Sequence, residues 1–139
     1  MAAATILLAS CQGSSGPALP GGPPIITVTM SEFRYDYNHA IPSGRVIFRM
    51  VNTGRLVHQP NLFPLSDSVP PIVQQVTGDQ RVVVAPFAGV LARKPGQVGT
   101  FAVDLVAGRR YAFVCFARTP DNQSHAKLGM ATEFRPPKK

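Results

Sequence analysis

The sequence predicts an all-β domain built as a sandwich of seven to eight short strands. First, 14 prolines and 12 glycines are scattered through the 139 residues, which disfavours long helices. Second, Val, Ile and Phe recur while long runs of Ala, Leu, Glu and Lys are absent, a composition typical of strands. Third, short apolar segments are separated by turn-forming sequences. A chain of this length fits one domain with its own hydrophobic core.

The strand candidates follow one another from residue 25 to residue 136. They are 25–30, 32–37, 45–52, 55–65, 80–86, 99–105, 111–116 and 129–136. Within 45–52, Val46, Phe48 and Met50 share one face, because successive side chains of a strand point to opposite sides. That face is expected to lie in the core.

The connections between these strands are also predicted. Pro60 and Pro64 interrupt 55–65, so this segment is expected to be an edge strand or an irregular one. The polar connection 66–79 is expected to hold one helical turn around "PPIVQQV", and 87–97 is expected to be a loop.

The first 24 residues form a segment of different character. A short apolar run leads to Leu8-Ala9-Ser10-Cys11, which resembles the lipobox of bacterial lipoproteins, where the cysteine is acylated. Residues 12–24, rich in Gly, Ser and Pro, would then be a flexible tether ahead of a folded domain at 25–139. We therefore expect lipidation of Cys11, export, and attachment to a membrane by the lipid anchor. The alternative is an apolar start with an incidental cysteine, since no basic residue precedes the run.

The net charge of +7 comes from 14 Lys and Arg against 7 Asp and Glu. This balance favours acidic protein partners and anionic membrane surfaces. The basic residues are dispersed and are not interleaved with a stripe of aromatic residues, so we expect no nucleic-acid binding. We expect the protein to be a monomer.

Cys115 is the only thiol left if Cys11 is acylated, so it has no intramolecular disulfide partner. In an oxidising compartment such a cysteine is expected to be buried or bound to something. It shares its strand face with Tyr111 and Phe113, so a small buried hydrophobe is one interpretation.

The second interpretation considers Cys115 together with three other donors. His125 and Met130 follow it in the chain, and His58 lies in the earlier extended segment. If the strand ends meet at one rim of the sandwich, these side chains supply a thiolate, two imidazoles and a thioether. Two His, one Cys and a weak axial Met form the donor set of a blue-copper electron-transfer site. His39 lies in a turn-like segment and is expected to be exposed.

Three segments resemble the cupredoxins, the family of small plastocyanin-like copper proteins. They are "VIFRMVNTGRLVH", "PGQVGTFAVDLVAGRRYAFVC" and the closing "HAKLGM" with "ATEF" after it. In plastocyanins four residues, the last a glycine, separate the second histidine from the methionine, and His125 to Met130 repeats this spacing. The resemblance covers most of 25–136. It implies a cupredoxin-like Greek-key β-sandwich with copper held by His58, Cys115, His125 and Met130.

The segment between Cys115 and His125 departs from the family. Nine residues separate them here, whereas plastocyanin, azurin and amicyanin have only a few. The loop contains Pro120 and the turn-forming Asp121-Asn122, so we expect it to fold back and return His125 to the rim.

The function expected from these residues is electron transfer by a type 1 copper centre at the outer side of a bacterial membrane. Two alternatives stay open: a copper carrier or sensor with the same ligands, and a metal-free structural module of the same fold. Cysteine-nucleophile catalysis is disfavoured because the sequence offers no third orienting group. A zinc site is disfavoured because the donor set does not match the usual structural ones.

Overall fold

The computed structural model describes residues 21–78, 82 and 88–138. Cys11 and its tether up to residue 20 lie outside the described residues, as does the strand predicted at 80–86 apart from Val82. The described part forms eight strands and one helix. They are β1 (Ile25–Ser31), β2 (Arg34–Asp36), β3 (Gly44–Asn52), β4 (Asn61–Leu65), α1 (Ile72–Thr77), β5 (Ala88–Gly89), β6 (Val98–Leu105), β7 (Arg110–Val114) and β8 (Ala131–Phe134).

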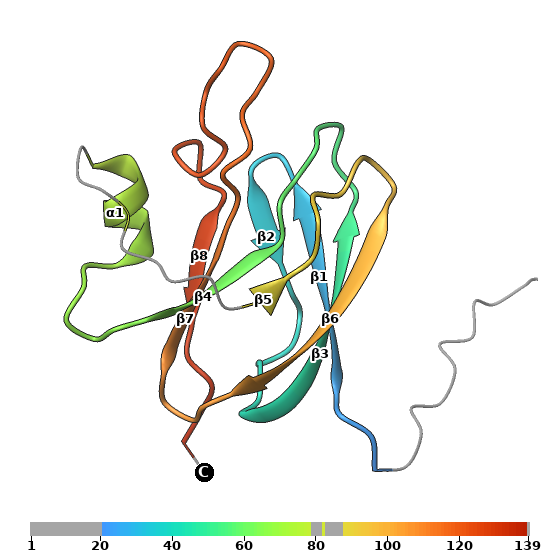
Figure 1. Cartoon of the computed structure of the whole chain (residues 1–139), viewed down its shortest axis with the longest axis vertical. Coiled ribbons are helices and arrows are strands. Elements are labelled where there is room, and N and C mark those ends of the chain that lie inside the picture. Colours follow the sequence, from blue (N-terminus) through green and yellow to red (C-terminus); the bar gives the residue numbers. More distant parts are fainter. Residues whose placement is uncertain (1–20, 79–81, 83–87, 139) are drawn as a thin grey trace, which may run out of the picture.

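The strands form two sheets of four, ordered β2-β1-β3-β6 and β5-β4-β7-β8 (Figure 1). β1 and β3 run parallel, and the other pairs are antiparallel. Val46, Phe48 and Met50 of β3 are fully buried, as the alternation of the strand predicts. The all-β prediction is confirmed.

Several strand boundaries differ from the sequence prediction: β2, β7 and β8 are shorter than the predicted 32–37, 111–116 and 129–136. The strand predicted from residue 55 begins at Asn61, because 55–60 turn the chain and Pro60 has no N–H for a sheet. Pro64 lies within β4, where the register pairs it with Tyr111 of β7. β5 lies inside the segment predicted to be a loop and pairs with Asn61 and Leu62 of β4. The helical turn predicted around 70–76 is confirmed as α1.

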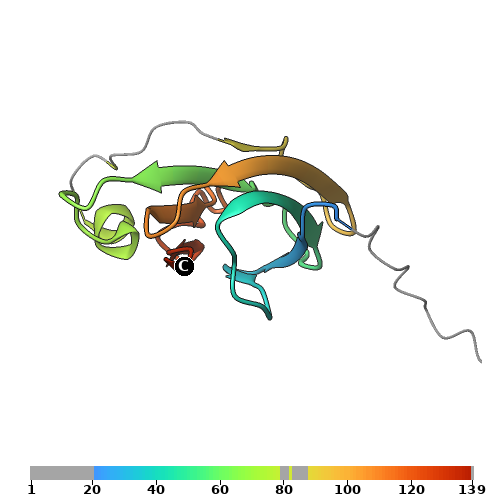
Figure 2. The ribbon, with the colours of Figure 1, turned by 90° about the horizontal axis from the view of Figure 1, so that it is seen from below.

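The main hydrophobic core lies between the sheets. Phe48 of the first sheet packs against Phe113 of the second, with ring centroids 5.2 Å apart. On the outer side of the second sheet, Ile72 and Val76 of α1 pack with Ala112 and other residues into a second core cluster. Figure 2 shows α1 beside the second sheet, away from the first. Because β7 is covered on both faces, all of its residues from Tyr111 to Val114 are buried.

The segments that carry the predicted donors meet at one end of the sandwich. This rim is formed by the β1–β2 turn, the β3–β4 connection, the segment between β5 and β6, and the long β7–β8 connection (Figure 1, top). Within the described residues, no helix is long and apolar enough to cross a membrane.

Candidate metal centre

His58, Cys115 and His125 lie together at this rim. One ligand atom from each side chain lies within 4.8 Å of the ligand atoms of the other two. All three residues are buried, with at most 1% of their surface exposed. His39, by contrast, is exposed as expected. The fold thus brings His58, from the β3–β4 connection, together with Cys115 and His125, from the β7–β8 connection.

His58 is held by a turn that Asn52 organises. The Asn52 amide donates to the carbonyls of Leu56 and Arg93, both at 2.8 Å, and its oxygen accepts from the N–H of Gly54 at 2.9 Å. The backbone of His58 exchanges two hydrogen bonds with Arg93, at 3.1 and 2.8 Å. The Asn-x-Gly sequence therefore has a specific role: it fixes the backbone from which the His58 ring projects.

Cys115 follows directly after the end of β7. Its N–H donates to the carbonyl of Met130 at 3.1 Å, and its sulfur accepts from the N–H of Gln59 at 3.3 Å. The Cys115 Sγ is also 3.4 Å from Nδ1 of His125. Burial raises the pKa of the Cys115 thiol, and the backbone N–H groups of Gln59 and Ala117 oppose that rise.

The nine-residue loop folds back on itself, as its turn chemistry predicts. Thr119 and Gln123 are joined by a backbone hydrogen bond of 2.9 Å, and Asn122 turns the chain with a φ of 67°. The N–H of His125 then donates to the carbonyl of Ala117 at 3.0 Å. The loop is therefore a small hairpin (Figure 1, the tall orange-red loop), and its closure places His125 beside Cys115.

Met130 is fully buried in the same core cluster as Cys115. Its N–H donates to the carbonyl of His125 at 2.9 Å, and its carbonyl accepts from Cys115. Its backbone is thus tied to both neighbouring donors. Its role as a fourth ligand stays a prediction.

Two buried imidazole nitrogens in the described structure, Nδ1 of His58 and Nε2 of His125, have no hydrogen-bond partner. Buried polar atoms in proteins are nearly always paired, so such atoms call for an explanation. Burial lowers the pKa of both histidines; for His125, His58 adds to this, and Glu32 opposes it for both. The neutral form of an imidazole is the form that binds a metal, and a cysteine binds one as the thiolate. One sulfur and two imidazole donors within 4.8 Å of one another fit a copper ion.

Comparison with solved structures identifies the fold. An auracyanin from the photosynthetic bacterium Roseiflexus castenholzii aligns over 83% of this chain and 97% of its own, with 17% identity and a TM-score of 0.56. Auracyanin B aligns over 89% of this chain and 96% of its own, with 14% identity and a TM-score of 0.57. This chain has the cupredoxin fold. No family model matches it, and a search of curated proteins finds no match.

Sequence reasoning gave no role at this site to four residues that support it. Glu32 lies 3.3 Å from Nε2 of His58, and Phe33 packs on the His125 ring with centroids 4.9 Å apart. Gln59 holds both the sulfur, through its N–H, and the N–H of Phe116, through its side chain. Asn52 was noticed only as part of a turn. Nothing in the linear sequence links Glu32 to a histidine 26 positions away.

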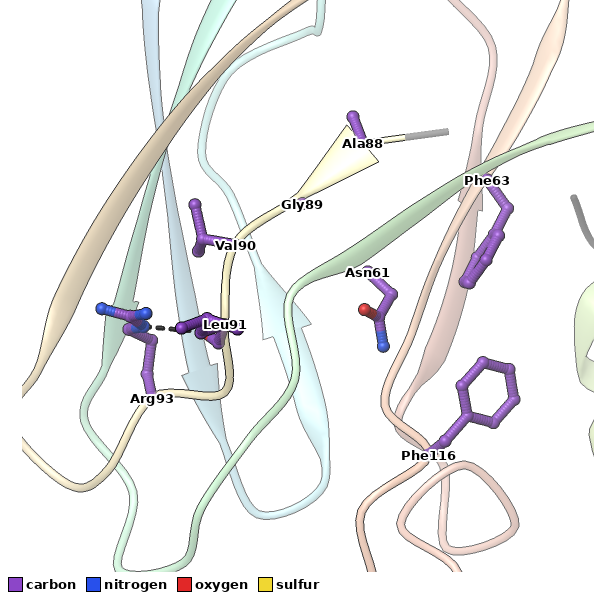
Figure 3. A pocket seen from close by; sticks show the side chains of 8 residues that line it. All are labelled: Asn61, Phe63, Ala88, Gly89, Val90, Leu91, Arg93 and Phe116. Atoms are coloured by element: carbon purple, nitrogen blue, oxygen red, sulfur yellow. Dashed lines mark hydrogen bonds between the residues drawn. The ribbon is translucent and has the colours of Figure 1, made fainter. Parts of the chain in front are cut away.

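A cavity of about 880 Å³ adjoins the site on the side of β4 and β5. Figure 3 shows the side chains around it, among them Phe63, Leu91, Arg93 and Phe116. Phe116 is the residue after Cys115, and Arg93 is bonded to the His58 backbone. Leu91 is 82% exposed and Phe116 is 42% exposed. The apolar surface beside the candidate site is therefore open to solvent.

Proposed function

We propose that this protein is a type 1 copper protein that transfers electrons and does not transform a substrate. The observation that carries the proposal is the buried cluster of one thiol and two imidazoles whose ligand atoms lie within 4.8 Å of one another. A copper ion bound there would supply one-electron chemistry by alternating between Cu(I) and Cu(II). His58, Cys115, His125 and Met130 would hold it.

The chain itself supplies the rigidity that such a site needs. His58 is fixed by Asn52 and Arg93, and Cys115 and Met130 are joined through their backbones. His125 is fixed by the closed hairpin and by Phe33. Because none of these contacts involves a metal, they would hold the donors in place in either oxidation state of a bound copper ion. Little rearrangement is then required when an electron is transferred.

The proposal includes a location and a partner. The lipobox-like Leu8-Ala9-Ser10-Cys11 supports a protein anchored by lipid at the outer side of a bacterial membrane. The net charge of +7 and the position of Arg93 beside the open apolar surface support an acidic redox partner. The proposal also takes the protein to be a monomer. Mass spectrometry of the mature amino terminus tests the acylation of Cys11.

Titration of the purified protein with Cu(II) tests the metal function. We expect an intense visible band from thiolate-to-copper charge transfer. Cys115→Ser should lose the band, while the control His39→Ala, which changes an exposed histidine outside the cluster, should keep it. Binding without the band would favour a copper carrier or sensor, and no binding would favour a metal-free structural module.

A further inference from the structure

One carboxylate oxygen joins the β1–β2 turn to the segment that carries His58. Oε1 of Glu32 accepts from the N–H groups of Arg55 at 2.6 Å and Leu56 at 2.8 Å. The same oxygen lies 3.3 Å from Nε2 of His58. The Glu32 side chain is 26% exposed, whereas that of His58 is fully buried. The carboxylate therefore sits at the edge of the site and contacts its interior through the imidazole.

The space that this carboxylate occupies is available because residue 54 is a glycine. A Cβ at position 54 would lie 2.5 Å from Oε1 of Glu32, with the other two carboxylate atoms next nearest. No backbone atom is among these closest neighbours. An added methyl group would thus displace the carboxylate without displacing the turn itself.

The two nitrogens of the His58 ring have different surroundings. Nε2 faces the carboxylate, while Nδ1 is buried without a partner and belongs to the ring that joins the Cys115–His125 cluster. A carboxylate accepts hydrogen bonds and cannot donate one when ionised. Oε1 of Glu32 already accepts from the backbone N–H groups of Arg55 and Leu56, so it acts as an acceptor toward its neighbours. The ring nitrogen that faces this acceptor, Nε2, therefore carries the proton.

We propose that Glu32 is a positioning residue that holds His58 as the Nε2–H tautomer and so leaves Nδ1 free to bind a metal. The part that concerns the metal rests on the proposed function, whereas the part that concerns the tautomer applies to the metal-free protein. Such a partner behind a ligating histidine fixes the ring and raises its basicity, and its loss typically costs 10- to 100-fold in metal affinity.

The tautomer can be read directly from metal-free protein labelled with ¹⁵N. Long-range ¹H–¹⁵N spectra, recorded where the imidazoles are neutral, distinguish a protonated ring nitrogen from an unprotonated one. In the native chain we expect His58 to show a protonated Nε2 and an unprotonated Nδ1. A protonated Nδ1 on His58 would overturn the proposal.

Three variants separate positioning from a general structural role. Glu32→Gln keeps an acceptor oxygen and should keep the tautomer, whereas Glu32→Ala removes it and should give a mixture of tautomers. Gly54→Ala keeps the carboxylate but displaces it, and should also give a mixture, even if Glu32→Ala fails to fold. Asp104→Asn, on an exposed ion pair of β6, is the control and should behave as the native chain. His125, whose ring packs on Phe33, should keep its own pattern throughout.

Copper affinity supplies the second measurement. Glu32→Ala and Gly54→Ala should bind Cu(II) about 10- to 100-fold more weakly than the native chain, and Glu32→Gln should lie close to it. A single Nε2–H tautomer retained in both Glu32→Ala and Gly54→Ala would refute the positioning role. If Glu32→Ala and Gly54→Ala give mixed tautomers of His58 but the native chain binds no copper, the proposed function is refuted and the positioning role is kept.

Discussion

Replacing Asn52 tests how strongly the turn before His58 supports the fold. The Asn52 side chain is fully buried and makes three hydrogen bonds of 2.8–2.9 Å, to Leu56, Arg93 and Gly54. Leu56 and Gly54 are themselves half-buried, so water can replace part of what is lost. The net value of about 1 kcal/mol per hydrogen bond therefore applies, and Asn52→Ala should lower the free energy of unfolding by about 3 kcal/mol.

Urea unfolding of the metal-free protein measures this loss. With an m-value of about 2 kcal/mol/M, the midpoint should fall by about 1.5 M. Asn52→Asp keeps the acceptor for Gly54 but turns a carboxylate oxygen toward two carbonyls, so it should be destabilised at least as much as Asn52→Ala. The exposed Asn38→Ala is the control and should change little. A loss below about 1 kcal/mol for Asn52→Ala, or native stability for Asn52→Asp, would show that the turn forms without this side chain.

Two further predictions concern pH and the loop. His58 and His125 have lowered pKa values in the folded protein, so the unfolded state binds more protons below about pH 6.5. Stability of the metal-free protein should therefore fall as pH drops through that value, and urea midpoints measured from pH 8 to pH 5 test this. His125→Gln should show a weaker dependence of the midpoint on pH. An unchanged dependence in that variant would contradict this cause. Asn122 has a φ of 67°, so Asn122→Val should cost about 1–2 kcal/mol while Asn122→Gly stays near native stability. Thermal unfolding of the pair measures the difference, and equal stability would contradict it.

Most of the fold was predictable because its signals are local. The alternation in β3 predicted the buried face correctly, and the turn-forming sequences separated most of the described strands. The start of β4 at Asn61 has a local cause, since Pro60 before it has no N–H for a sheet. The short β5 was not predicted, because it forms by pairing with Asn61 and Leu62, which a local pattern does not contain.

The donor residues were also recognisable, because His58, Cys115, His125 and Met130 are metal-binding types that are rare in this chain, and the His125-to-Met130 spacing resembles that of plastocyanins. Their roles as ligands stay predictions until the copper titration is made, as does acylation of Cys11, which lies outside the described residues. The turn residues Pro120 and Asn122 predicted that the long loop would fold back, and the hairpin confirms it.

What the sequence by itself determined is therefore the fold class, the strand faces and the kinds of donor available. Tertiary structure alone decided that three donors share one site and that Glu32 and Phe33 hold the two imidazoles. The physical reason is the range of the interactions. Strand periodicity acts between neighbours in the chain, whereas the site joins residues of both sheets that meet only when the sandwich closes.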